Sequence, residues 1–61
     1  MKYGIFYKSH GKWSKTPWSY SFPIYKGQVA ESVCEAKQIL KSKVLVKQLI
    51  NSKWVPTNIK V

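Results

Sequence analysis

Polar and apolar residues alternate at the start of the chain. In KYGIFYK, residues 2–8, Tyr3, Ile5 and Tyr7 fall on one face, and Phe6 falls on the other with the flanking lysines. Alternation with a period of two, rich in aromatic and β-branched residues, predicts a β-strand. The next four residues, SHGK, form a predicted turn in which Gly11 is free to take a positive φ.

A second alternating segment, WSYSFPIY at residues 18–25, predicts a second strand. One face of this strand would carry Trp18, Tyr20, Phe22 and Ile24, and we expect these side chains to be core. Pro23 has no amide proton to donate, so this end of the strand is expected to be a sheet edge or a bulge.

The hydrophobic period changes between Gln28 and Ser42. Apolar residues now recur at spacings of three and four, which predicts an amphipathic helix of about four turns. The apolar stripe consists of Val29, Val33, Ala36 and Leu40. No Ser, Thr, Asp or Asn stands at the start, so Gly27 is the expected N-cap.

The last third of the chain is again rich in β-branched residues. VLVKQLI at residues 44–50 predicts a third strand, although continuation of the helix through Val44 stays open as an alternative. NSK is a turn signal, and the tail WVPTNIKV predicts a short edge strand or a packed extended segment. The expected fold is α+β: a single domain, residues 1–61, with a ββαβ(β) antiparallel sheet and one amphipathic helix packed on one face.

Length and cysteine usage limit how such a chain is stabilised. With 61 residues and one cysteine, Cys34, it forms no intrachain disulfide. It also contains no set of cysteines and histidines with the spacing of metal ligands. Aromatic side chains must then supply most of the buried apolar surface. Alternatively, a second copy of the chain buries part of it in a homodimer. The start of the chain lacks a secretory apolar run, and no segment approaches the ~20 apolar residues of a membrane span. We therefore expect a cytoplasmic protein without membrane contact.

The charge is strongly one-sided. Eleven lysines face two glutamates, with no arginine and no aspartate, for a formal net charge of +9. Such a field attracts polyanions. Lysine holds phosphate as a point charge, whereas arginine forks onto guanine edges, so this composition favours backbone contact over base reading. An AT-rich coding sequence is an alternative cause of the lysine bias.

Few side chains could perform catalysis. Glu31 and Glu35 stand four residues apart on the predicted helix, where two solvated glutamates are the simpler interpretation. His10 is expected to be exposed in a turn, and Cys34 to be a small buried or half-buried side chain. No nucleophile, base and orienting group come together. We predict a protein that is not an enzyme and needs no cofactor or metal.

Rings beyond the predicted core suggest a binding surface. Phe6, Trp13, Tyr25 and Trp54 do not all fit beneath one helix, and rings flanked by lysines can hold nucleic acid by base stacking and phosphate contact. The alternative is that Trp13 and Trp54 close the two ends of the core, with the lysines as a solvated face. The candidate binding residues, for nucleic acid or another partner, are Lys8, Lys12, Trp13, Lys15, Lys43, Lys47, Lys53 and Trp54.

Two resemblances bear on the partner. GKW at residues 11–13 and YSFPIYKGQVAESVCEAKQIL at residues 20–40 resemble the arm-site DNA-binding domain of tyrosine recombinases, in which a three-stranded sheet docks in the major groove. That family carries its third strand before the helix and has arginine-rich strands, unlike this chain.

Over its whole length the chain also resembles, in style, the small early or accessory host-takeover proteins of tailed bacteriophages. Its size, lysine bias, aromatic density and lack of catalytic groups carry this likeness. The resemblance implies a place in the host bacterial cytoplasm. It also implies a rival to nucleic-acid binding: an inhibitor or regulator that docks an exposed sheet face or edge on an acidic host protein. A structural role as a small subunit of a larger assembly is a third possibility.

Overall fold

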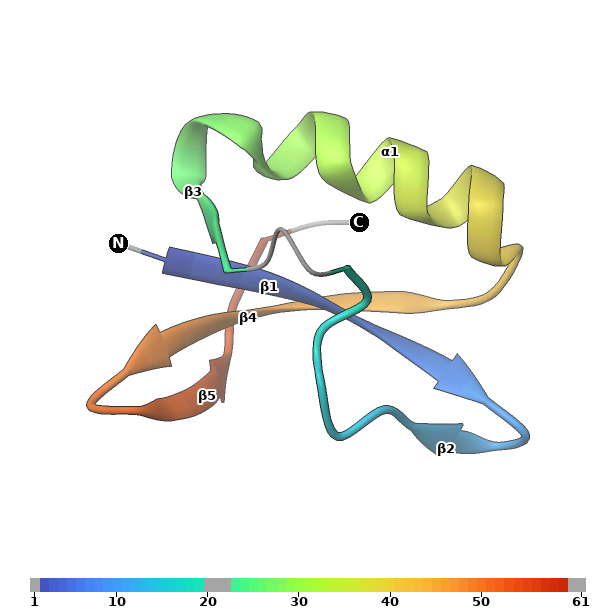
Figure 1. Ribbon diagram of the computed structural model, residues 1–61, viewed down its shortest axis with the longest axis horizontal. Coiled ribbons are helices and arrows are strands. Elements are labelled where there is room, and N and C mark those ends of the chain that lie inside the picture. Colours follow the sequence, from blue (N-terminus) through green and yellow to red (C-terminus); the bar gives the residue numbers. More distant parts are fainter. Residues whose placement is uncertain (1, 20–22, 60–61) are drawn as a thin grey trace.

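The computed structural model describes residues 2–19 and 23–59 and has the α+β architecture that the sequence predicts (Figure 1). An antiparallel sheet is packed against one helical segment, which opens with a 3₁₀ turn, η1. The elements in chain order are β1 Lys2–Ser9, β2 Lys12–Trp13, β3 Ile24–Tyr25, η1 Lys26–Gln28, α1 Val29–Leu40, β4 Val44–Ile50 and β5 Lys53–Pro56.

Strand β1 lies at the centre of the sheet and is paired along both edges. On one edge it pairs with β4 from Lys2↔Leu49 to Tyr7↔Val44, and β5 continues the sheet beyond β4. On the other edge β2 pairs with the end of β1 and β3 with its start. The helix α1 crosses one face of the sheet, and both hairpin ends lie on the other side (Figure 1).

The segment after β2 corrects the predicted second strand. Of the described residues in this segment, 18–19 and 23–25, only Ile24 and Tyr25 are in a strand; Tyr20 and Phe22 lie outside the described residues. The Trp18 amide donates to the Ile5 carbonyl at 2.9 Å, but Pro17 and Pro23 have no amide proton to extend a ladder. Among the described residues, this edge of β1 is thus paired by two short strands and by the Trp18 amide.

Ser14 takes part in closing this edge. Its amide donates to the Tyr7 carbonyl at 2.7 Å, and its hydroxyl accepts a hydrogen bond from the Tyr7 amide at 3.2 Å. A side-chain oxygen therefore stands where a strand would supply a carbonyl, so the Tyr7 amide stays satisfied as the chain turns away.

Two hairpins use two-residue turns with the same backbone hand. His10 and Gly11 connect β1 to β2 with φ of 51° and 79°, and Asn51 and Ser52 connect β4 to β5 with φ of 49° and 64°. Positive φ at both central residues is the requirement of a type I′ turn, whose twist matches that of the paired strands. The positive φ expected for Gly11 is confirmed.

The core between sheet and helix follows the predicted alternation. The buried residues of this core, each no more than 7% exposed, are Tyr3, Ile5, Ile24, Val29, Val33, Ala36, Val44 and Val46. The predicted core residues Tyr7, Trp18 and Leu40 are half-buried against it, together with Ile59. The apolar stripe of the helix is thus confirmed.

The helix differs from its prediction at both ends. Its N-cap is Gln28, without a side-chain cap bond, and the predicted cap Gly27 instead lies inside η1. It ends before Lys41, whose left-handed backbone has φ of 52° and whose amide donates to the Lys37 carbonyl at 3.0 Å. That reversal excludes the alternative of a helix continuing through Val44, and the predicted third strand is confirmed as β4.

The predicted edge strand and packed extended segment both occur in the tail. Beyond β5, the Thr57 hydroxyl donates to the Val46 carbonyl at 2.8 Å and accepts from the Ile59 amide at 3.3 Å. The tail is therefore tied to β4 just before Ile59 packs against the core.

A second apolar cluster lies on the sheet face away from the helix. Phe6, expected to be an exposed ring, is only 1% exposed, which corrects that prediction. Trp54 packs edge-on against it with ring centroids 5.2 Å apart, and the Lys47 ammonium lies 4.7 Å from the Phe6 centroid. Gly4 leaves the space, because a Cβ there would lie 2.9 Å from the Trp54 ring and 3.2 Å from Pro17.

We expect Gly4→Ala to destabilise the fold by about 1–3 kcal/mol, because the added methyl group overpacks against the Trp54 ring. Gly27→Ala is the matched control, since nothing lies within 4 Å of a Cβ at that position. Urea unfolding of both variants measures the difference. Equal midpoints would contradict the close approach of Trp54 to Gly4.

Candidate nucleic-acid interface

The sheet face opposite α1, called here the outer face, gathers rings and lysines from five strands. Successive strand residues point to opposite sides, and the pairing registers therefore fix which residues share this face. It consists of Lys2, Gly4, Phe6 and Lys8 of β1, Trp13 of β2, Tyr25 of β3, Leu45, Lys47 and Leu49 of β4, and Trp54 and Pro56 of β5.

Two exposed rings each stand directly opposite a lysine of β1. Trp13 pairs with Lys8, and Tyr25 pairs with Lys2. The rings are 41% and 61% exposed. Directly opposite side chains have Cβ atoms about 4.5–5.5 Å apart, so each ring has an ammonium group within reach. The two ring–lysine pairs lie at opposite ends of the same edge of β1.

The two glutamate carboxylates are confined to the helix side of the molecule, whereas lysines lie on both sides. Both glutamates, Glu31 and Glu35, are exposed on α1, as the sequence predicts. The outer face combines Lys2, Lys8 and Lys47 with no carboxylate side chain. An anion that approaches this face therefore meets positive charge without local repulsion.

The structure brings together some of the predicted site residues. Lys8, Trp13, Lys47 and Trp54 share the outer face. Lys43 is exposed next to β4, and its carbonyl accepts a hydrogen bond of 3.0 Å from the Lys8 amide. One end of the outer face is thus lined by neighbouring lysines and a tryptophan.

Other predicted residues lie elsewhere. Lys12 pairs with Ser9 and Lys53 with Ile50, so alternation puts both on the helix side of the sheet. Lys15 is exposed in the segment that follows β2. Trp54 is half-buried over Phe6, so it does close one end of a core, whereas Trp13 does not.

Lys2 and Tyr25 join the surface although neither was in the final set of candidate binding residues; Tyr25 was named only as a ring outside the predicted core. Their pairing depends on a register between residues far apart in the sequence, Lys2↔Tyr25, which no local pattern reveals. Tyr25 had one signal: its alternation opposite Ile24 set it apart from the core face.

Of the candidate catalytic side chains, Glu31, Cys34 and Glu35 lie on α1, and His10 lies in the turn between β1 and β2. His10 is exposed in its turn, as predicted, and Cys34 is exposed on α1, which corrects the expectation of a buried or half-buried thiol. Its Sγ accepts only a long contact of 3.8 Å from the Gln38 amide nitrogen. Within residues 2–19 and 23–59 no group of three His, Cys, Asp or Glu side chains comes together as a metal site.

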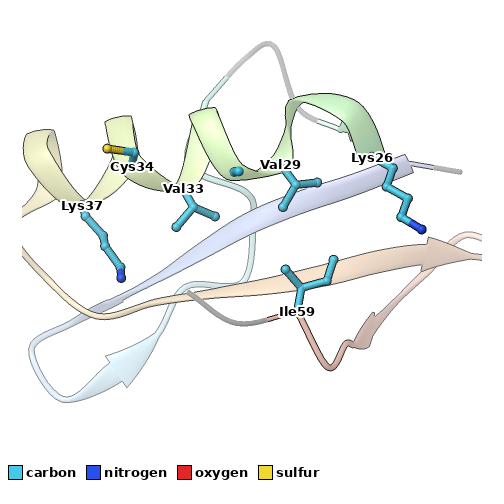
Figure 2. A pocket seen from close by; sticks show the side chains of 7 residues that line it. Lys26, Val29, Val33, Cys34, Lys37 and Ile59 are labelled. Carbon is cyan, nitrogen blue, oxygen red and sulfur yellow. The ribbon is translucent and has the colours of Figure 1, made fainter.

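An apolar groove of about 460 Å³ lies on the helix side of the molecule. Val29 and Val33 point from α1 toward Ile59, and Lys26 and Lys37 stand at the two ends (Figure 2). The exposed rings of Trp13 and Tyr25 take no part in lining it. The groove and the outer face are therefore separate features, and among the described residues the outer face is the one that combines exposed rings with lysines.

The chain matches no protein-family model, no curated protein and no solved structure. In the part of the chain that the structure describes, the helix is too short and too polar to cross a bilayer.

The two tryptophans of the outer face are expected to differ in what they stabilise. Trp54→Ala uncovers Phe6 and should reduce the free energy of unfolding by about 3 kcal/mol or abolish folding. Trp13→Ala removes an exposed ring and should change it by less than about 0.5 kcal/mol. Circular dichroism in urea measures both, and a large loss in Trp13→Ala would assign that ring to the core.

Proposed function

We propose that this protein is a small, non-enzymatic nucleic-acid-binding module that uses the outer face. The observation that carries the proposal is the combination of two exposed rings, each opposite a lysine, on a face that holds no carboxylate side chain. Lysine ammonium groups neutralise phosphates and release counterions, and exposed rings add stacking on bases.

The absence of arginine supports binding with little sequence preference. Bidentate contacts to guanine in the major groove come mainly from arginine, while a lysine ammonium is a compact point charge. Affinity would then come from phosphates and base faces, which every nucleic-acid sequence provides.

A salt titration with two matched variants tests the proposal. Lys8 and Lys12 belong to the same hairpin, and either change to Ala lowers the net charge equally, but their side chains lie on opposite faces. We expect Lys8→Ala to weaken binding and to lower the slope of log K against log salt by about one unit. Lys12→Ala should leave the slope close to that of the unchanged protein.

Fluorescence anisotropy of a labelled oligonucleotide between 50 and 200 mM salt provides the measurement. Identical slopes for the two variants would mean that the outer face does not bind. No measurable binding at 50 mM salt would contradict the function itself.

The rival function, a regulator that docks on an acidic host protein, predicts a different result in one experiment. Tagged protein is used to capture partners from bacterial lysate with and without nuclease treatment. A nucleic-acid ligand leaves no protein bound after nuclease, whereas a direct protein partner is retained. Retention of one protein at a constant ratio would replace the proposed function by the rival.

A further inference from the structure

We infer that the outer face holds one single strand of nucleic acid along β1, with one base on Trp13 and a second base on Tyr25. This inference rests on the proposed function and names the class of nucleic acid that the face selects. Its first basis is that β2 and β3 pair with the same edge of β1, so both rings border one continuous strand.

The spacing of the two rings sets the length of the ligand. Trp13 is level with Lys8 and Tyr25 with Lys2. Six residues of a β-strand cover about 20 Å at ~3.3 Å per residue. A stacked strand rises ~3.4 Å per nucleotide, so about six steps, or seven nucleotides, join a base on one ring to a base on the other.

A fixed cation stands across β1 from the two rings, at a level between them. Lys47 pairs with Gly4, which lies between Lys2 and Lys8 along β1. Its ammonium is held 4.7 Å from the Phe6 centroid. Phosphates between the two stacked bases would therefore pass a positive group that packing already positions, with less side-chain entropy to lose than a mobile lysine.

A duplex cannot use this arrangement. The faces of its bases are stacked inside the helix, and only base edges and phosphates reach a protein surface. The rings of Trp13 and Tyr25 are 41% and 61% exposed, and stacking on them requires the faces of unpaired bases. Between the rings, Trp54 and Pro17 lie over Gly4, so a bound strand would cross these two side chains and not the backbone of β1.

Ring variants and a length series test the inference. Affinities for dT3, dT8, dT16 and an 8-base-pair duplex are measured by fluorescence titration at 50 mM salt. We expect dT8 to bind at least tenfold more tightly than dT3 and the duplex. The affinity for dT16 should exceed that for dT8 only by the number of positions in which the longer strand can bind. Trp13→Ala and Tyr25→Ala should each weaken dT8 binding by about 5- to 150-fold, the equivalent of one stacked base.

Three controls separate stacking from loss of folding or charge. Tyr25→Phe keeps a ring and should retain dT8 affinity, and Ile39→Ala removes an equally exposed side chain from α1. Circular dichroism confirms that each variant is folded. The rU8 oligomer should bind within a few-fold of dT8, because base faces and phosphates are common to both.

The outcomes are distinguishable. If the unchanged protein binds neither single strand nor duplex, the proposed function fails and the inference with it. If the duplex binds as tightly as dT8, or if Tyr25→Ala retains full affinity while Trp13→Ala loses it, the inference is overturned and the function stands. A preference above tenfold for rU8 or dT8 contradicts recognition by base faces and phosphates alone.

Discussion

The pairing of β1 along both edges is the constraint on which the other elements depend. On one edge it forms its ladder with β4, and on the other it is bonded to two short strands and to the segment between them. Both faces of β1 are also covered, by the helix-side core around Ile5 and by the cluster around Phe6. A small domain without disulfide or metal can bury enough surface when its central strand uses both faces.

This doubly covered strand also explains how a buried cluster and the proposed binding surface share one face. Phe6, Trp54 and the stem of Lys47 fill the middle of the outer face, whereas Trp13 and Tyr25 stay exposed at its two ends. The buried centre supports the sheet, and the ends remain available to a ligand. Placement of both glutamates on α1 keeps negative side chains away from this surface.

The sequence was sufficient to predict those elements that the local spacing of hydrophobic residues defines. Alternation in residues 2–8, the helical stripe at Val29 to Leu40 and the β-branched run after Val44 all predict what is observed. Alternation did not predict the backbone at Trp18, Ser19 and Pro23, which lie outside strands, because it reports which side chains share a face but not whether the backbone has a partner. At the other end of this edge the Ser14 hydroxyl, not a strand carbonyl, accepts from the Tyr7 amide.

The candidate site was less predictable, because its composition depends on register. Lys12 lies beside Trp13 in the sequence but on the other side of the sheet, whereas Tyr25 and Lys2 meet from distant parts of the chain. Phe6 was assigned to the correct face, but its burial depends on Trp54 reaching it from β5, two strands away. Side-chain reach across a curled sheet is not encoded in any window of neighbouring residues.

The position of β4 late in the chain affects how the protein avoids aggregation during synthesis. β1 is made before its main partner, Val44–Ile50, so the intervening residues must exist before the central ladder closes. Until then YGIFY, apolar on both faces, resembles the short segments that seed aggregation. Lys2 and Lys8 flank it as gatekeepers, whose charge opposes association between unfolded copies. The two lysines proposed to contact a ligand thus also oppose aggregation of the nascent chain.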